Sequence, residues 1–435
     1  MGFDPKQKRL RCMGHVINLI AGAYLFGQDE ASFDDEYKRA SAADRRKLWR
    51  RRREVGKLHN LVAHVMASGK RSELFLDLQK TLNIGVAEGK KWKLILDGGV
   101  RWNATYWMIR RGLELRESLT SYAAMLHVSA DPFDQEIFDN DYLSDEEWES
   151  LTIIKDQLAP LFYLTKGLEG NAKLTEGALQ PSHGALWEAL IVLEHIMAHF
   201  ETLEAEAKDG KFNDHEGIRQ SITLAWGACQ KWYRKTDDSV AWQAAMVLHP
   251  RYKWTYFEKN WTGKLLPYLI AGKAAFKKLW EERYKGQAPA VNSRSTQSPE
   301  PSPAISSVER DYLKSILDAA APQPVIRRSA TTNGRRDQYH YYLQEPTIDY
   351  LSLMEYWKLH EVEWPQLAQM AFDLLAIPAM SSECERVFSS CAKQTTAESS
   401  SLSGLMLWHQ ECLKNWQNRG AIEIAGAFGA VLLDI

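Results

Sequence analysis

The chain has 435 residues, of which 45% are hydrophobic and 25% are charged. This length allows two or three domains with cores of their own, and the composition is ordinary for a globular protein. The net charge of −2 excludes a chain that binds polyanions by its overall charge, so any contact with nucleic acid must come from local basic patches.

The cysteines and the hydropathy of the chain indicate its redox compartment and whether it spans a membrane. Five scattered cysteines favour a reducing compartment, and none forms a Cys-x-x-Cys pair that could begin a structural zinc site. The first residues show no signal-peptide pattern, and no apolar run reaches the ~18 residues of a membrane span. We therefore expect no membrane partner.

The first predicted helix follows a Cys-x-x-His motif. Apolar residues recur at helical spacing at Val16, Leu19, Ile20, Ala23 and Tyr24. Gly27 is a suitable end for this helix. Cys12 and His15 stand at its start, but structural zinc needs four ligands. Periodicity alone favours a hydrogen-bonded, partly buried His15.

A dense basic run follows at residues 45–53, where seven of nine positions are Lys or Arg. Such a run is usually the solvated face of a helix. It could also contact DNA phosphates, through Arg50, Arg51, Arg52 and Arg53, or act as a nuclear localisation signal. The pattern leaves these interpretations open.

Residues 94–96 (Leu-Ile-Leu) predict a short buried strand, and a helix is expected from Asn103 onward. Arg101 and Trp102, between them, read either as a stacked structural pair or as part of a binding site. Long amphipathic helices are predicted over residues 145–285.

The region after these helices predicts a linker. Residues 287–307 are rich in Pro and Ser and predict a disordered segment, followed by a short helix at 308–320. Near the C-terminus, one helical face carries an apolar stripe made of Leu405, Trp408, Cys412, Leu413 and Trp416. That stripe packs either on its own domain or against another chain.

The most informative stretch is residues 373–389, where an apolar run meets Pro378 and a new helix begins. Ser382 and Glu385 fit a capping box. Glu385 therefore reads either as an acid that complements the helix dipole or as a metal ligand, and the local pattern does not choose between them.

Several ordered motifs resemble the hAT family of DNA transposases. The signature is matched by Ile377, Pro378, Ala379, Ser381, Glu385, Arg386, Phe388 and Ser389. Further matches are Cys12, His15, Asn18 and Leu19, then Arg101, Trp102, Asn103 and Tyr106, and finally residues 411–416. In that family the last region is a dimerisation segment.

The resemblance implies a mostly α chain with a partial α/β core. That core would be an incomplete RNase H-like transposase core, interrupted by a large all-helical insertion domain. The expected segments are a partial core at 1–125, the insertion at 126–286, a disordered linker with a short helix at 287–338, and a dimerisation region at 339–435.

The resemblance also implies chemistry. Glu385 would be the last acid of a DDE triad, with His15 beside it, and an intact transposase would use Mg²⁺ or Mn²⁺. We expect the first two aspartates and the zinc finger to be missing from this chain, so that Glu385 binds metal only if partners are supplied. No cofactor of its own is expected.

The favoured hypothesis is a nuclear, transposon-derived protein that forms homodimers or larger homo-oligomers through the apolar stripe. It would bind double-stranded DNA through Arg50–Arg53, Arg101, Trp102 and Arg386, and would not cut DNA alone. One alternative is a partial chain of an active DDE transposase. Another is a helical interaction scaffold without a role on DNA.

Overall fold

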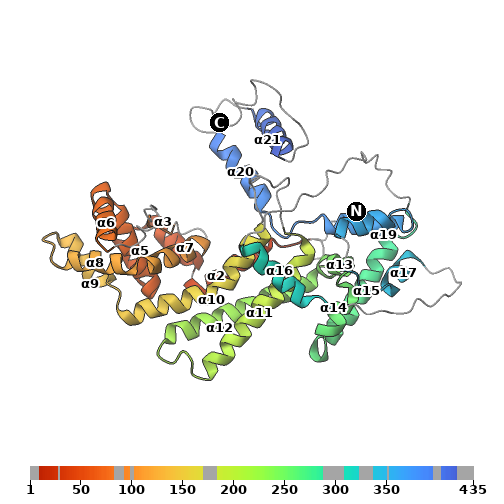
Figure 1. Cartoon of the computed structure of the whole chain (residues 1–435), viewed down its shortest axis with the longest axis horizontal. Helices are drawn as coiled ribbons and strands as arrows, with labels where there is room; N and C mark the ends of the chain where they lie inside the picture. The colour runs from red at the N-terminus through yellow and green to blue at the C-terminus, as the bar shows by residue number, and fades with distance from the viewer. Residues whose placement is uncertain are drawn as a thin grey trace. The chain divides into compact units, whose positions relative to one another are not determined.

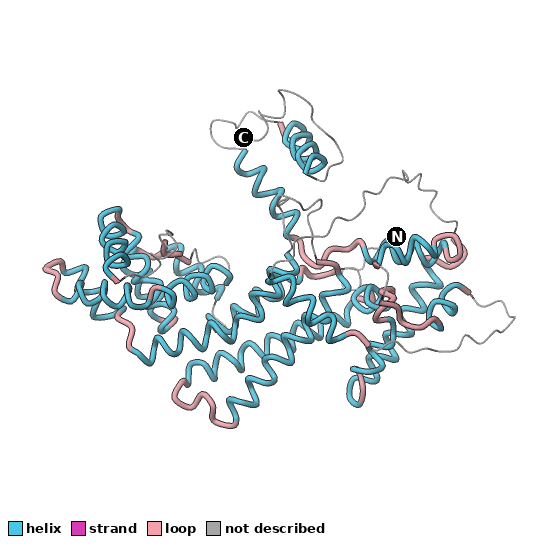
Figure 2. The backbone as a smooth tube through the Cα atoms, in the orientation of Figure 1, coloured by secondary structure: helices cyan, strands magenta, loops and turns pink. Residues whose placement is uncertain are grey.

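The computed structural model describes residues 9–27, 30–82, 93–97, 102–169, 184–287, 308–322, 337–349, 352–394 and 403–418. Over these residues the chain consists of helices joined by turns (Figures 1 and 2). The prediction of a mostly α chain is confirmed. The partial α/β core is not supported, since the described residues contain no strand and only one isolated bridge, between Ala185 and Pro378.

The strand predicted at 94–96 is wrong for a physical reason. Residues 93–97 have no regular structure, and a strand needs a neighbour to accept and donate its backbone hydrogen bonds. Leu94 is buried, whereas Leu96 is 37% exposed. The segment is held instead by Asp97, whose buried carboxylate accepts a hydrogen bond from the Thr105 hydroxyl.

The chain divides into two compact units, and each combines segments that are distant in sequence. The α5 unit contains residues 17–162 and 196–231, and the α13 unit contains residues 1–16, 163–195 and 232–435. The four consecutive segments expected from the sequence divide the chain differently and stay a prediction.

The α5 unit is centred on α5 (Arg53–Met66), which contacts α4, α6, α7 and α9. Val55, Leu58, Leu61 and Val62 are at most 3% exposed, which makes α5 the core helix of this unit. The other helices with residues here are α2 (Met13–Phe26), α3 (Glu30–Arg39), α4 (Ala42–Arg50), α6 (Gly69–Thr81), α7 (Trp102–Glu114), α8 (Arg116–His127), α9 (Pro132–Asp141), α10 (Asp145–Glu169), α11 (Leu186–Lys208) and α12 (Glu216–Tyr233).

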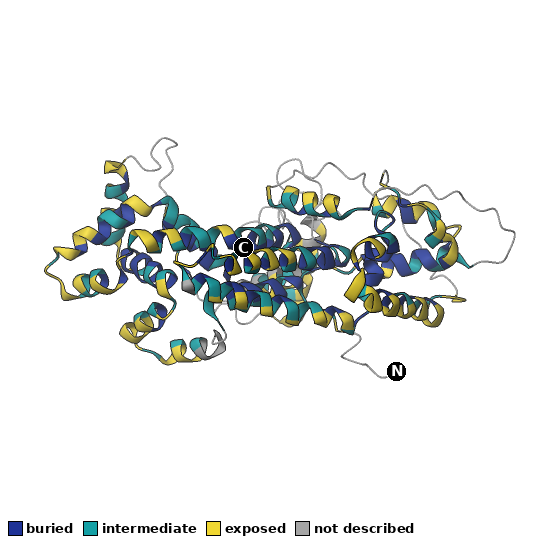
Figure 3. Cartoon of the chain, turned by 90° about the horizontal axis from the view of Figure 1, so that it is seen from below, coloured by how far each residue is buried: buried dark blue, intermediate teal, exposed yellow. Residues whose placement is uncertain are grey.

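The α13 unit is centred on α13 (Ala241–Val247), which contacts α14, α15 and α19. Six of the seven α13 residues, Trp242 to Val247, are buried, and Figure 3 shows buried and exposed residues side by side along the helices. The remaining helices that lie wholly in this unit are η2 (Arg234–Asp238), α14 (Lys253–Asn260), η3 (Gly263–Leu265), α15 (Leu266–Arg283), α16 (Val308–Ala320), α17 (Gln338–Gln344), α18 (Leu353–His360), α19 (Pro365–Leu375), α20 (Ser382–Gln394) and α21 (Gly404–Asn418).

Several predicted helix boundaries agree with the structure. Gly27 follows α2 with a φ of +73°, a backbone conformation that glycine adopts without a steric penalty. Helix α16 spans Val308–Ala320 as predicted. The predicted disordered segment before it lies outside the described residues from position 288 onward.

Candidate functional site

The signature stretch at residues 377–381 is a meeting point of distant segments within the α13 unit. The Leu186 N–H donates to the Ile377 carbonyl at 2.8 Å, and the Ala379 N–H donates to the Gly184 carbonyl at 2.9 Å. The Met13 N–H donates to the Ala379 carbonyl, also at 2.9 Å. The structure therefore joins the start of α2, the start of α11 and the entry to α20.

The Cys-x-x-His motif contributes one further contact here. The Ser381 N–H donates to the Cys12 sulfur at 3.3 Å. An ideal Cβ built on Gly14 would lie 2.2 Å from the Met380 methyl carbon, so a side chain at position 14 would force Met380 to move. The Cys12 sulfur is thus a side-chain acceptor for a backbone N–H of the signature stretch.

Glu385 lies in the first turns of α20 and is exposed. The Ser381 hydroxyl donates to its carboxylate at 3.2 Å. The sequence predicted that Ser382 would be the cap, the residue just before the helix. Helix α20 begins at Ser382, so the residue just before it is Ser381. The predicted serine partner of Glu385 is therefore displaced by one residue.

His15 is exposed rather than partly buried as periodicity suggested. Its ring meets the Trp232 ring edge-on, with the centroids 6.5 Å apart. The Arg11 guanidinium lies 4.9 Å from the centroid of the same indole. Trp232 is therefore flanked by two side chains from the start of the chain, an arrangement with an aromatic and a cation–π contact.

The described residues do not fit the metal ions that the resemblance implies. A pair of Mg²⁺ or Mn²⁺ ions needs several oxygen ligands that converge on one place. Over the described part of the chain, no three His, Cys, Asp or Glu side chains gather in this way. Glu385 alone cannot hold such a pair, and we derive no step of DNA cleavage from it.

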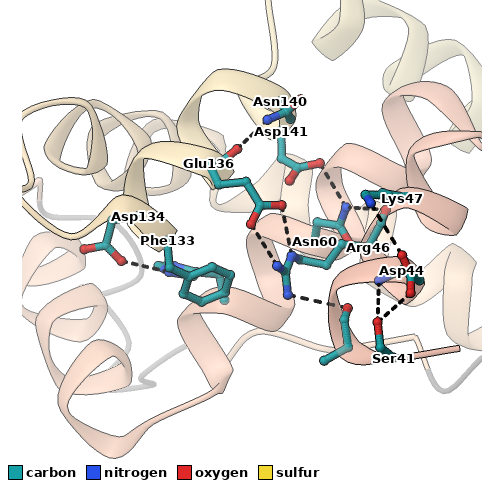
Figure 4. A network of polar contacts seen from close by, with 12 residues as sticks. Ser41, Asp44, Arg46, Lys47, Asn60, Phe133, Asp134, Glu136, Asn140 and Asp141 are labelled. Atoms are coloured by element: carbon teal, nitrogen blue, oxygen red, sulfur yellow. Dashed lines mark hydrogen bonds and ion pairs between the residues drawn. The ribbon is translucent and has the colours of Figure 1, made fainter.

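In the basic run at 45–53, some side chains form ion pairs within the α5 unit and others are exposed on its surface. Arg46 forms an ion pair with Glu136 at 2.8 Å (Figure 4). Arg50 donates to Asp141 at 2.6 and 3.0 Å, and also reaches Glu136 at 3.1 Å. The Asp141 side chain has no exposed surface. These two arginines therefore fasten α4 to α9.

The next three arginines have different surroundings. Arg51 is 67% exposed at its side chain and pairs with the exposed Glu36 at 2.8 Å. Arg52 stacks over aromatic rings, with its guanidinium carbon 3.7 Å from the Phe26 centroid and 3.4 Å from the Phe33 centroid. The side chain of Arg51 is thus far more exposed than those of Arg46 and Arg50, which are 21% and 18% exposed.

Arg53 has a φ of +52°, in the left-handed region that favours glycine. Its guanidinium donates to the Gln220 side chain at 3.3 Å. An ideal Cβ on Gly217 would lie 1.4 Å from the same guanidinium, so a side chain at position 217 would force the Arg53 guanidinium to move. The three arginines at 51–53 and the first turns of α12 line a cavity of about 180 Å³.

The other residues predicted to bind DNA are Trp102, Arg101 and Arg386. Trp102 is 3% exposed and packs edge-on against Tyr106, with the centroids 6.1 Å apart, which favours a structural role. Arg101 lies outside the described residues, and so does the side chain of Arg386, although Arg386 is part of α20.

The apolar stripe predicted near the C-terminus lies on the outer face of α21. Leu405, Trp408 and Trp416 are 65%, 59% and 49% exposed, and Leu413 is 38% exposed. Cys412 is half-buried. The stripe is therefore open to a partner over most of its length.

The opposite face of α21 is held by α20. The Ser390 hydroxyl donates to Glu411 at 2.7 Å, and the Lys414 ammonium donates to the Ser390 hydroxyl at 2.8 Å. Since α21 is packed through its polar face, its apolar stripe is left without cover among the described residues.

Sequence reasoning assigned no role to residues 248–253, Leu-His-Pro-Arg-Tyr-Lys. The Trp357 indole N–H donates to the Leu248 carbonyl at 2.9 Å, and the Ile348 N–H donates to the Pro250 carbonyl at 3.1 Å. This short stretch thus fastens the segment from α17 to α18 onto α13. The partners are about a hundred residues downstream, so no local signal identifies them.

Lys253 is the most unusual member of this stretch. It is 3% exposed, with a φ of +49°, and its ammonium donates to the carbonyls of Tyr342 at 2.8 Å and Glu345 at 3.1 Å. Burial lowers the pKa of Lys253 to about 8. The ammonium binds carbonyls at the C-terminal end of α17, where a cation is favoured by the helix dipole.

Comparison with protein families identifies two regions of the chain. Residues 338–417 match the hAT family C-terminal dimerisation region. Residues 10–157 match the ZBED1 RNase-like helical domain. The first region runs from the start of α17 into the last turn of α21 and includes the whole apolar stripe.

Two curated relatives come from Oryza sativa subsp. japonica. Zinc finger BED domain-containing protein RICESLEEPER 2 is 22% identical over 390 residues, which cover 83% of this chain and 48% of the relative. RICESLEEPER 3 is 23% identical over 353 residues, which cover 78% of this chain and 41% of the relative. The chain therefore spans less than half the length of these relatives.

None of the described helices is both long and apolar enough to cross a membrane. The ordered signature motifs, the match over 338–417 and the BED zinc finger relatives agree with one another. The chain therefore resembles the hAT family, and its residues 338–417 match that family's C-terminal dimerisation region.

Proposed function

We propose that this protein self-associates through the apolar stripe of α21. The observation that carries the proposal is the exposure of Leu405, Trp408 and Trp416 on one face of a helix whose other face is already packed. Large exposed apolar patches on soluble proteins mark interaction sites. The stripe lies wholly inside the matched dimerisation region, which supports the same conclusion.

The apolar area of the stripe contributes favourably to association. Covering the exposed parts of these three side chains removes on the order of 300 Å² of apolar surface from each copy. At ~25 cal/mol per Å², two copies gain roughly 15 kcal/mol, against an association cost of about 4–15 kcal/mol. One aspartate in the middle of the stripe would reverse this balance, because it would be buried without a partner.

The test is multi-angle light scattering after gel filtration. The variant Leu405→Asp/Trp408→Asp should elute as a monomer at concentrations where the parent chain is a dimer or larger. Gln410→Asp adds a carboxylate to the same helix away from the stripe and should leave the oligomer intact. Dimers that persist in the double variant would refute the proposed surface.

A second candidate function is contact with DNA phosphates through Arg51 and Arg53. The exposure of Arg51 and the position of both arginines on the cavity at the start of α12 favour it. A helix N-terminus attracts anions, and arginine is suited to phosphate. The relatives' BED zinc finger names support a DNA-associated, nuclear role for the whole protein.

Binding to duplex DNA should be measured at ~50 mM salt, where phosphate contacts are strongest. Arg51→Ala and Arg53→Ala should each weaken binding, whereas Lys70→Ala, an exposed charge on α6, serves as the control. Undetectable binding by the parent chain would favour the scaffold hypothesis. A fluorescent fusion with Arg51→Ala and Arg53→Ala that still enters the nucleus would count against these residues as a nuclear signal.

A further inference from the structure

A cavity of about 230 Å³ lies within the α13 unit, walled by α14, α15, α17 and the turn that follows α17. Its lining includes Lys253 and Trp254 of α14, Lys273 of α15, Tyr339 of α17, and Thr347. None of these residues is part of the apolar stripe of α21 or of the basic run at 45–53. The cavity is therefore separate from both interaction surfaces proposed above.

Two side chains that line this cavity are buried hydrogen-bond donors. The Trp254 indole N–H and the Thr347 hydroxyl form no hydrogen bond with any described residue, and the two residues are 6% and 8% exposed. An indole N–H can only donate, and a hydroxyl always has a proton to give. Buried donors without a partner destabilise a fold, so two of them on one cavity point to a ligand that accepts hydrogen bonds.

The same cavity carries a buried positive charge. The Lys253 ammonium donates to the carbonyls of Tyr342 and Glu345, which are neutral groups. The Glu345 carboxylate accepts from the Tyr356 hydroxyl at 2.8 Å, and none of the described carboxylates forms an ion pair with Lys253. A buried cation whose partners are neutral favours an anion beside it.

Aromatic rings form the apolar walls. The Trp254 ring meets the Phe276 ring edge-on, with the centroids 5.8 Å apart, and the Phe276 centroid lies 5.7 Å from that of Tyr339. Lys273 and Glu258 are 40% and 42% exposed and pair at 2.6 Å, so their charges offset each other on the solvent side. Apolar walls with a few polar groups are the usual composition of a small-molecule site.

The volume of the cavity limits the size of its ligand. A cavity of about 150 Å³ holds one benzene molecule, so about 230 Å³ has room for a benzene ring and roughly three further heavy atoms. A carboxylate adds that number of atoms. Its two oxygens accept hydrogen bonds from N–H and O–H donors, and its charge complements an ammonium.

We propose that this cavity binds a small aromatic carboxylate. The carboxylate accepts from the Trp254 indole N–H and the Thr347 hydroxyl beside the Lys253 ammonium, and the ring packs against the aromatic walls. Because Tyr339 and Thr347 lie inside the matched region 338–417 and Trp254 lies before it, the ligand fastens the start of that region to α14. The proposal does not depend on self-association or on DNA binding.

Isothermal titration calorimetry of the full chain with benzoate tests the site. Benzoate should bind with a Kd of ~1 mM or lower, because its roughly nine heavy atoms need only a modest contribution each to reach that value. Benzamide has the same shape, but an N–H donor replaces one charged oxygen. It should bind at least ~10-fold more weakly, because that donor would face other donors. Benzoate that does not bind, or binds no better than benzamide, overturns the proposal.

The substitution Thr347→Val separates a ligand-binding role from a structural one. Because the hydroxyl has no partner in the described chain, its removal should leave the Tm unchanged or raise it. The affinity for benzoate should nevertheless fall at least ~5-fold. The control is Thr262→Val, an exposed threonine of the same unit that does not line the cavity. Equal benzoate affinities of the two variants would mean that benzoate binds elsewhere, and would overturn the proposal.

The substitution Trp254→Phe removes the other donor and keeps an aromatic ring in the wall. It should also weaken benzoate binding at least ~5-fold. Benzoate at ~10 times its Kd should raise the Tm of the parent chain, and the increase should be lost in the variant that carries both substitutions. If Thr347→Val alone melts well below the parent, Trp254→Phe decides the question, and an unchanged affinity in that variant refutes the site.

Discussion

The substitution Arg50→Met tests whether Arg50 stabilises the fold, through its ion pair with Asp141, or instead serves to bind DNA. The guanidinium of Arg50 contacts both carboxylate oxygens of Asp141, at 3.0 and 2.6 Å. The Asp141 side chain has no exposed surface, and the Asn60 amide is a third donor at 2.9 Å. Removing the arginine leaves a buried carboxylate with one neutral donor.

The expected magnitude follows from that burial. Breaking a buried ion pair on one side costs about 3–5 kcal/mol of unfolding free energy. The neighbouring Arg51 pairs with Glu36, but both side chains are exposed, at 67% and 48%. Such a surface pair contributes about 0–1 kcal/mol, so Arg51→Met is the matched control.

The assay is urea unfolding followed by tryptophan fluorescence, with midpoint and slope fitted for each variant. Arg50→Met should be destabilised by several kcal/mol and Arg51→Met by less than ~1 kcal/mol. Arg50→Met/Asp141→Leu replaces both partners by apolar groups and should recover much of the loss. Equal effects of the two single variants would refute the structural interpretation of Arg50.

Two other changes probe the core of the α5 unit. Gly56→Ala should lower the free energy of unfolding by at least ~1–3 kcal/mol in urea, because its Cβ would lie 1.7 Å from the Trp49 carbonyl oxygen. The control is Gly69→Ala, whose Cβ would have no atom within 4 Å and which should be neutral or stabilising. His59 stacks on Trp49 with centroids 3.7 Å apart, and burial lowers the pKa of His59 to about 3. The unfolded chain therefore binds this proton first, and stability falls by ~1.4 kcal/mol per pH unit from about 6.5 down to 3. His59→Phe should lose less stability between pH 7 and 5, and an unchanged pH profile would contradict this assignment.

Local sequence signals predicted the helix ends well. The glycine at 27 acts through a backbone conformation that needs no knowledge of the rest of the fold. The bounds of α16 could be predicted for the same reason, because its periodicity begins and ends within a polar context. The exposed stripe of α21 follows from periodicity, but only the contacts of Ser390 show which face is covered.

The structural role of a residue could not be predicted from the sequence where it depends on partners that are distant along the chain. The Leu-Ile-Leu run at 94–96 has strand propensity, yet no neighbouring strand lies among the described residues to pair with it. The buried site of Trp102 could not be distinguished from an exposed stacking site. From the sequence alone, Lys253 would be expected on the surface, as most lysines are. The structure shows instead that its ammonium donates to the carbonyls of Tyr342 and Glu345.

The basic run shows why charge density alone overstates affinity for DNA. Seven cations lie at 45–53, but the guanidinium groups of Arg46 and Arg50 already neutralise Glu136 and Asp141. If all seven contacted phosphates, log K would fall with log[salt] with a slope of about −6; if only Arg51 and Arg53 do, the slope is about −1.8. A slope near −2 that halves in Arg51→Ala would support two contacts. A slope near −6 would mean that DNA displaces the acids of α9, and Arg50 would then have to leave a partner with no exposed surface.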